Sequence, residues 1–179
     1  NAAMLLGNIA NFFLDRVLNE PSVAWQPLFR ETFQLYPFTY APMSDAEVRE
    51  ISGKAQKHFL NLKSMASGGL AQQGIQPDDC VLEPTFFSAH YGIQGRLDLF
   101  YRTERASAIV ELKSGKPYKP NSYGIQRSHF TQTLLYDLLV RSVFGHSTDP
   151  AKYILYSGVD VNHLRFAPTI APEQWEALQ

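Results

Sequence analysis

The sequence contains one cysteine, Cys80, in 179 residues, so no disulfide can form within the chain and a reducing compartment is favoured. It has no apolar run of about 18 residues, which a membrane-spanning helix would need. No secretory signal pattern opens it. These absences lead us to expect a cytoplasmic protein without a membrane partner.

Charge is also scarce in this sequence. Charged residues make up 18% and the formal net charge is −1, which excludes a broad nucleic-acid coat held by charge alone but leaves room for a local basic groove. The length favours a single domain over residues 1–179. Within it we predict a helical part at 1–70 and a sheet and helix at 81–167. The chain begins without methionine and stops soon after a helix begins, so we expect a fragment of a longer protein.

The N-terminal part shows helical periodicity. Residues 4–18 have apolar side chains at helical spacing and predict an amphipathic helix. The stretch at 21–42 is rich in proline and aromatic residues, and we expect an irregular surface segment there. Ser44 and Glu47 form a capping box that begins a further helix, which Gly68 and Gly69 are expected to end.

The period then changes to that of strands. Residues 81–90, 93–102 and 107–113 read as three strands, and a short polar turn makes the last two a hairpin. After a loop, a helix is expected over 128–145. A strand at 152–159 follows, with a candidate partner strand in HLRFAPT. This order predicts an α/β fold with a mixed central sheet flanked by helices.

Alternation along the strands brings three polar side chains together. Glu111 and Lys113 share one face of the third strand, because alternate residues of a strand point the same way. In the second strand the same rule places Arg96, Asp98 and Phe100 on one face, with Leu97 and Leu99 on the opposite face. The hairpin can therefore bring Asp98 beside Glu111 and Lys113.

Two neighbouring carboxylates repel each other, and a divalent cation relieves that repulsion. Oxygen ligands that leave water sites open suit Mg²⁺ or Mn²⁺. Lys113 would neutralise or orient a metal-bound hydroxide or the oxygens of a phosphate. A cross-strand salt bridge on a solvated sheet face would explain the same spacing.

The residue pattern of the helix at 128–145 favours a metal site over a cross-strand salt bridge. His129, Gln132 and Tyr136 recur at steps of three and four, so they share one helix face. Histidine and tyrosine are unusual choices for a face that only meets water. The polar stripe is therefore expected to lie beside the carboxylates.

Three motifs together resemble the PD-(D/E)XK nuclease superfamily, and in particular its RecB-like branch. They are GIQGRLD at residues 92–98, IVELKSGK at 109–116, and the set His129, Gln132 and Tyr136. That branch includes the nuclease domains of replication and recombination helicase-nucleases and the CRISPR-associated exonucleases. A lone ExK would be weak evidence, but the three motifs follow the family's order and approximate spacing.

The resemblance implies a restriction-endonuclease-like core and a divalent-metal-dependent deoxyribonuclease. Such an enzyme would hydrolyse phosphodiester bonds on single-stranded DNA ends or flaps during replication, recombination or repair. A helicase domain in the same polypeptide or complex is the implied partner. Exonuclease and endonuclease action, polarity and a preference for DNA over RNA are left open by the sequence.

The resemblance also assigns roles. The implied catalytic residues are Asp98, Glu111, Lys113, Gln132 and Tyr136. Asp98 and Glu111 would bind Mg²⁺ or Mn²⁺ with the backbone carbonyl of Leu112, and Lys113 would be the catalytic lysine. Gln132 and Tyr136 would steady the site and contact the DNA backbone.

Supporting residues and departures from the family pattern complete this interpretation. Asn11 stands where the family's first helix often has histidine, and an amide can hold a metal-bound water but cannot act as an imidazole. Glu83 and His129 are candidate supporting residues, although Glu83 fits a plain solvent-facing position equally well. Some relatives hold an iron–sulfur cluster on four cysteines. With Cys80 alone, no such cluster is expected in this chain.

Basic residues suggest where DNA would lie. The candidates are Arg96, Lys116, Lys119 and Arg127. Tyr118 and Tyr123 accompany the last three, and basic residues interleaved with aromatic ones suit a single strand. An ordinary mobile loop explains the same residues equally well.

Two rival functions remain at this point. One is a catalytically weak DNA-binding module of a helicase-nuclease complex, which Asn11 and the near-neutral charge favour slightly. The other is a solute-binding or purely structural α/β domain. That third hypothesis leaves the polar stripe on the 128–145 helix unexplained.

Overall fold

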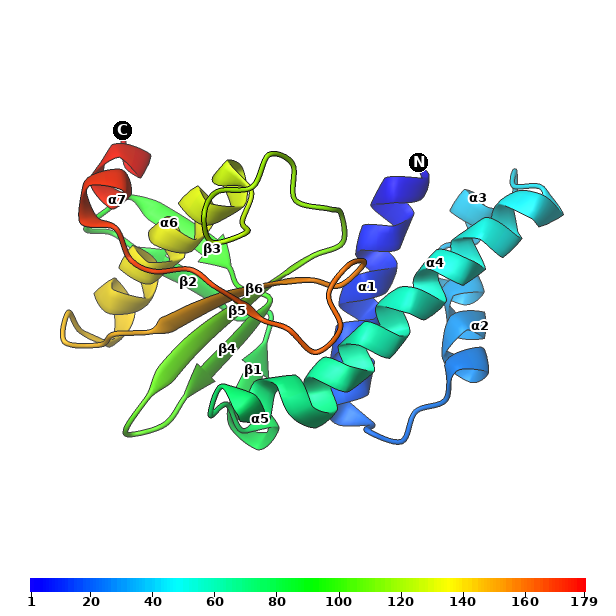
Figure 1. Cartoon of the computed structure of the whole chain (residues 1–179), viewed down its shortest axis with the longest axis horizontal. Helices are drawn as coiled ribbons and strands as arrows, with labels where there is room; N and C mark the ends of the chain where they lie inside the picture. The colour runs from blue at the N-terminus through cyan, green and yellow to red at the C-terminus, as the bar shows by residue number, and fades with distance from the viewer. The chain divides into compact units, whose positions relative to one another are not determined.

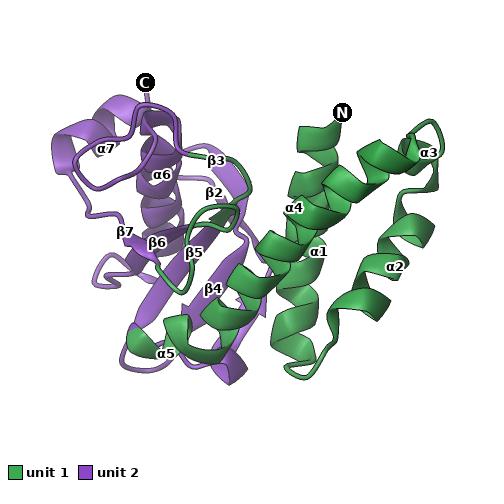
Figure 2. Cartoon of the chain, turned by 45° about the vertical axis from the view of Figure 1, so that its right-hand side comes forward, with its two compact units in different colours: residues 1–72, 112–116, 156–163 green, residues 73–111, 117–155, 164–179 purple.

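In the computed structural model, which describes residues 1–179, the chain forms two units (Figures 1 and 2). Unit 1 comprises residues 1–72 with two short segments, 112–116 and 156–163. Unit 2 comprises residues 73–111, 117–155 and 164–179.

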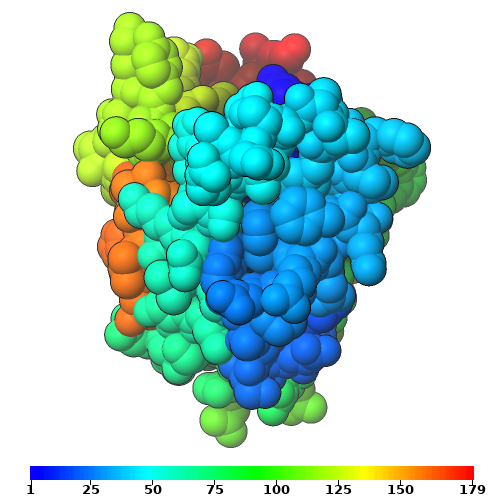
Figure 3. Space-filling view, turned by 90° about the vertical axis from the view of Figure 1, so that its right-hand side faces the viewer, coloured from blue at the N-terminus to red at the C-terminus, as the bar shows by residue number.

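Unit 1 is mainly helical. Its elements are α1 (Ala2–Asn19), α2 (Trp25–Leu35), α3 (Pro37–Tyr40), α4 (Asp45–Ser64), a π-helical turn (Met65–Gly69) and α5 (Leu70–Gln72). Helices α1 and α4 lie side by side in Figure 1. The Phe13 ring of α1 packs edge to face on the Phe59 ring of α4, with 5.9 Å between the ring centres. Helices α2 to α4 make up much of this unit's surface in Figure 3. The apolar stripe predicted at residues 4–18 is thus confirmed as a helix.

The capping box is present as expected. The Oγ of Ser44 accepts from the backbone N–H of Glu47, and the Oε1 of Glu47 accepts from the backbone N–H of Ser44, both at 3.2 Å. These two bonds satisfy amide donors that the first turn of a helix leaves without partners.

The segment at 21–42 is not irregular, so that prediction was wrong. It contains α2 and α3. Pro27 lies in the first turn of α2 and Pro37 begins α3, and both are positions where a missing amide proton costs little. The burial of Leu28 and Phe29 then stabilises α2 through tertiary packing that the proline content concealed.

The helix from Ser44 does not end at Gly68 and Gly69, which is a second correction. It continues as the π-helical turn and α5 to Gln72, and Gly74 has a φ of +74°. A Cβ on Gly69 would lie 2.8 Å from Oδ1 of Asn162. Glycine is needed there for close packing rather than for ending the helix.

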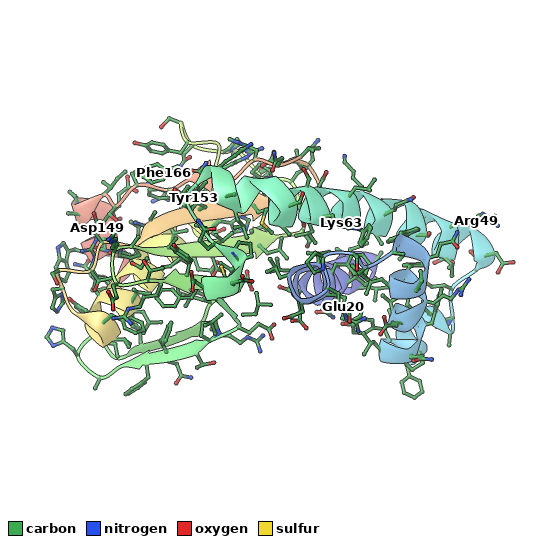
Figure 4. The ribbon with its side chains drawn as sticks, turned by 90° about the horizontal axis from the view of Figure 1, so that it is seen from below. Glu20, Arg49, Lys63, Asp149, Tyr153 and Phe166 are labelled. Carbon is green, nitrogen blue, oxygen red and sulfur yellow. The ribbon has the colours of Figure 1, made fainter.

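The sheet has five strands in the order β1-β4-β5-β6-β7. They are β1 (Cys80–Leu82), β4 (Leu99–Arg102), β5 (Ser107–Lys113), β6 (Ala151–Tyr156) and β7 (Arg165–Phe166). β4 pairs antiparallel with both β1 and β5, and β6 pairs antiparallel with β7. Figure 4 labels Tyr153 and Phe166, whose rings lie 5.9 Å apart across the β6–β7 pair. The predicted α/β class with a mixed central sheet is confirmed.

The first two predicted strands are each broken in the middle, contrary to expectation. β2 (Thr85–Ser88) and β3 (Ile93–Arg96) form a separate two-stranded sheet. Glu83 has a φ of +55°, and Pro84 has no amide proton for a ladder. The partner strand breaks opposite this point, where Glu83 N–H donates to the Asp98 carbonyl at 3.1 Å.

Helix α6 (Arg127–Phe144) covers one face of unit 2. It begins one residue before the predicted start, and Gly145 follows its last turn with a φ of +111°. Its buried side chains pack in a cluster comprising Leu97, Phe100, Ile109, Leu139 and Val140. Leu97 was expected on the face opposite Phe100. The break between β3 and β4 resets the alternation and brings both into this cluster.

Unit 2 also contains a short helix and a buried polar network. A 3-10 turn (Pro77–Asp79) precedes β1, and α7 (Ala171–Ala177) follows β7. The Asp137 carboxylate on α6 is fully buried. It accepts from Arg141 at 2.9 Å and from Gln174 of α7 at 2.8 Å, and it lies 3.5 Å from Nζ of Lys152. No helix of the structure has both the length and the apolar character to cross a membrane.

Candidate metal and nucleic-acid site

Asp98 and Glu111 lie side by side, as the hairpin predicted. Leu99 pairs with Val110, so Asp98, one residue before β4, comes opposite Glu111. The backbone N–H of Asp98 donates to Oε1 of Glu111 at 3.1 Å. Glu111 is only 3% exposed and Asp98 is half-buried. A buried carboxylate therefore has a fixed position beside a second, more accessible one.

Tyr136 on α6 is bonded to the same part of the chain as the Asp98 and Glu111 pair. Its hydroxyl accepts from Nε2 of Gln132 at 3.0 Å and donates to the carbonyl of Arg96 at 3.3 Å. Burial raises the pKa of Tyr136 to about 12, and the negative charges of Glu111 and Asp98 contribute to the rise. The phenol consequently stays protonated near neutral pH and remains a hydrogen-bond donor beside the carboxylates.

Gly95 on β3 allows this approach. A Cβ at this position would lie 2.8 Å from Cε1 of Tyr136 and 3.4 Å from a methyl group of Leu139. The Tyr136 ring thus occupies the space that a side chain would need. The second glycine of the GIQGRLD motif serves the packing of α6 against β3, a role that the sequence analysis missed.

Gly95→Ala is expected to destabilise the protein and displace Tyr136. The added methyl group overpacks the contact, which typically costs about 1–3 kcal/mol. Gly53→Ala, at an exposed position of α4, is the matched control. A Cβ there meets nothing within 4 Å, and alanine should stabilise that helix by about 0.5–1 kcal/mol. Thermal unfolding of both variants tests the contact. Equal shifts of Tm in the two variants would contradict it.

Leu112 and Lys113 follow Glu111 directly in β5, at a point where the chain enters unit 1. Leu112 is buried and Lys113 is half-buried. The backbone carbonyl of Lys113 accepts from the amide of Ser157 at 3.0 Å. Ser157 in turn bonds Nδ1 of buried His58 at 2.8 Å, and burial lowers the pKa of His58. This network fixes the backbone that carries Lys113.

Asn11 lies on α1 within unit 1. Its side-chain amide donates to the carbonyl of Gly7 at 3.1 Å. Gly7, one turn earlier, comes so near the end of β5 that a Cβ on it would be 3.3 Å from Oγ of Ser114. The helix face that carries Asn11 therefore approaches the segment immediately after Lys113.

The other candidate residues lie at exposed or half-buried positions. Glu83 is exposed at the strand break, where only its backbone is bonded to Asp98. His129 is half-buried, one turn before Gln132 on α6. Arg96 is exposed on β3, and its carbonyl receives the Tyr136 hydroxyl.

The basic candidates divide between the units. Lys116 is exposed in the 112–116 segment of unit 1. In unit 2, Lys119 and Arg127 line a hollow of about 560 Å³ together with Glu173 and Glu176. The acidic side chains of α7 thus face the two cations, so the hollow carries mixed charge.

Aromatic residues accompany these cations. Nζ of Lys119 lies 5.2 Å from the centre of the Tyr118 ring, which is 67% exposed. Tyr123 stacks on Phe130 of α6, with ring planes 4° apart. The loop therefore presents Tyr118 to solvent while Tyr123 anchors it to α6.

No group of three or more His, Cys, Asp or Glu side chains in residues 1–179 is arranged to hold a metal ion. A cation at Asp98 and Glu111 would have to complete its shell with a backbone carbonyl and water. A scan against protein-family models finds no match, and a search of curated proteins finds no significant match either.

Proposed function

We propose that the chain is a divalent-metal-dependent DNA nuclease of the RecB-like branch of the PD-(D/E)XK superfamily, with a restriction-endonuclease-like core. The observation that carries the proposal is the pairing of Asp98 with Glu111, in which one carboxylate is fixed by the backbone amide of its neighbour. The three motifs that resemble the family meet at this pair. Asp98 and Glu111 belong to the first two motifs, and Tyr136 of the third donates to the Arg96 carbonyl and has its pKa raised in part by both carboxylates.

The donor set fits Mg²⁺ or Mn²⁺. Asp98 and Glu111 are hard oxygen ligands, and the Leu112 carbonyl is next in the chain, so a cation with several waters would suit them. When bound, the ion would supply a Lewis acid that makes water acidic and offsets charge on phosphate.

The chain's own residues would have distinct parts. Lys113 would offer its ammonium group to the phosphate oxygens or to the attacking water. The protonated Tyr136 would donate hydrogen bonds and hold the Arg96 segment in place, while Gln132 would orient the phenol. Arg96 and Lys116 are exposed and would contact the DNA backbone, as would Lys119 and Arg127. The proposed substrate is a single-stranded end or flap, met beside a helicase partner.

A second candidate is a DNA-binding module with little or no cleavage activity. Two observations favour it. The side chains supply only two carboxylates rather than three metal ligands, and the amide of Asn11 bonds its own helix. The same fold and the same DNA contacts would serve either function, so activity must decide between them.

The deciding experiment combines metal binding with cleavage. The wild type should cleave labelled single-stranded DNA in Mn²⁺, and Mn²⁺ should raise its Tm. At about 100 times the dissociation constant the ion stabilises by about 2.7 kcal/mol, which for a chain of this length is a rise of several degrees. Asp98→Ala should lose both effects, whereas Asp78→Ala, at an exposed position, should keep them.

Asp98→Ala should also raise the Tm measured without metal, because one of two repelling charges has been removed. A manganese-induced shift of the same size in Asp98→Ala would refute the metal site. If the wild type binds DNA but cleaves no single-stranded, duplex or flap substrate, the binding-module function is the correct one.

A further inference from the structure

A groove of about 290 Å³ lies between β3 and α6 in unit 2, two elements that run beside each other in Figure 1. Its walls include the apolar side chains of Ile93, Leu135 and Leu139 and the ring of Tyr136. Gln94 and Gln132 supply amide groups to the same lining. The volume is close to the lower end of the range for small-molecule pockets.

Tyr136 links the groove to the segment that carries Asp98. Tyr136 and Gln132 line the groove and are bonded to each other. The Tyr136 hydroxyl also donates to the carbonyl of Arg96, two residues before Asp98, at 3.3 Å. A molecule in the groove would therefore contact Tyr136, the residue that joins the groove to the strand segment leading to the proposed site of phosphodiester cleavage.

The lining decides what chemistry fits. No Asp, Glu, Lys or Arg side chain lines the groove, and its polar groups are the amides of Gln94 and Gln132 and the hydroxyls of Ser128, Thr131 and Tyr136. It therefore offers no charge to a phosphate or to a metal ion. Apolar walls and an aromatic ring suit the faces of a flat heterocycle. Glutamine amides offer both donors and acceptors, and these suit the polar edges of the same ring. A neutral planar base with hydrogen-bonding edges matches each of these properties.

We propose that this groove binds one unpaired nucleobase of the DNA strand whose phosphate lies at Asp98 and Glu111. The inference rests on the proposed function and adds the means of selecting a single strand. In a duplex the base is stacked and its edge is paired, so it would have to leave the helix to enter. A single strand presents its bases without that cost.

The test uses DNA binding in a chelator, so that it does not depend on cleavage. The probes are fluorescein-labelled single strands of about 12 nucleotides, within the usual site sizes, each with one abasic residue at a different position. Fluorescence anisotropy should show affinity falling about 10-fold when the abasic residue occupies one particular position, as expected for losing one stacked base. Elsewhere the abasic residue should change affinity little.

Two variants assign that base to the groove. Leu135→Trp fills it and should bind intact and abasic strands with the same, reduced affinity. Gln94→Ala, at an exposed position, should keep the position dependence but weaken the preference among the four bases. Leu60→Trp on α4, where the leucine is 57% exposed, is the matched control and should behave as the wild type.

Affinity that does not depend on the abasic position would overturn the inference, as would full position dependence in folded Leu135→Trp. So would a wild type that binds no DNA. Failure of the proposed function is distinguishable, because it would remove cleavage and the manganese shift while leaving the position dependence measured in chelator.

Discussion

Glu111→Gln is expected to lower metal-dependent cleavage by about 100-fold or more without disturbing the fold. The side chain is 3% exposed and accepts from the amide of Asp98. Glutamine keeps an oxygen that can accept the same bond but loses the negative charge that would hold the cation. Removing one preorganised electrostatic group from an active site typically costs about 100- to 1,000-fold in turnover.

The control is Glu104→Gln, an equivalent change at an exposed position in the turn between β4 and β5. Cleavage of labelled single-stranded DNA in Mn²⁺ should be unchanged in this variant. The Glu111 variant should also lower the pKa of Tyr136, because one of the charges that raise it has gone. Titration of the tyrosine ring by NMR would show this even if turnover were undetectable. Wild-type turnover in Glu111→Gln would leave the carboxylate with a structural role only.

Local periodicity predicted the parts of the fold that depend on neighbouring residues. The bounds of β5 and the capping box at Ser44 follow from alternation and from side chain to backbone bonds three residues apart. The pairing of Asp98 with Glu111 was predictable for the same reason. A short turn between two strands fixes their register, and one reliable register places every later pair.

Features set by distant contacts were not predictable in this way. Alternation through residues 93–102 placed Leu97 opposite Phe100, but the break at Glu83 and Pro84 turns the chain between two sheets. Pro84 indicated the break in the first strand, since proline rarely lies within a paired strand. Nothing in the sequence indicated the positive φ of Glu83. Gly68 and Gly69 looked like a helix end because nothing in the sequence reveals Asn162 beside them.

One part of the candidate site was predictable from local periodicity, and the other part was not. Its carboxylates come from one hairpin, and their proximity follows from the hairpin register. The position of Tyr136 depends on a contact with Gly95, 41 residues earlier in the numbering, which the motif spacing could suggest only through a family resemblance. The groove beyond it is lined from two separate elements, so no single periodic pattern could have revealed it.

Asp137→Ala is expected to cause the largest loss of stability. Asp137 is fully buried on α6 and Lys152 is 2% exposed on β6, with 3.5 Å between the carboxylate and the ammonium group. Removing one partner of a buried ion pair leaves an uncompensated charge and costs about 3–5 kcal/mol. For a chain of this length that corresponds to a fall in Tm of roughly 6–20 °C.

Asp149→Ala is the matched control. Asp149, labelled in Figure 4, bonds the same Arg141 at 2.8 Å, but its side chain is 86% exposed. An exposed ion pair contributes less than about 1 kcal/mol, so this variant should unfold close to the wild-type temperature. Comparable losses in the two variants would mean that burial of the network is not what makes Asp137 important.

The stability lost in Asp137→Ala is expected to depend on pH. Burial lowers the pKa of Lys152, while the charge of Asp137 opposes that effect. Without Asp137 the pKa of Lys152 should fall further below its ordinary value of 10.5. Between the lowered pKa and that value the unfolded chain binds more protons than the folded one, so the stability of the variant rises with pH. Its deficit relative to the wild type should therefore be smaller near pH 9 than near pH 7.

A double variant separates the buried charge from simple loss of packing. Asp137→Leu with Lys152→Met removes both charges and keeps apolar volume, and such replacements of buried pairs are often neutral or stabilising. Urea unfolding should show the double variant to be more stable than Asp137→Ala. Its own stability should not rise between pH 7 and pH 9 as that of Asp137→Ala does, because Lys152 has been removed. If it is no more stable than Asp137→Ala, the hydrogen bonds of Asp137 to Arg141 and Gln174, rather than its charge opposite Lys152, hold α6 and α7 in place.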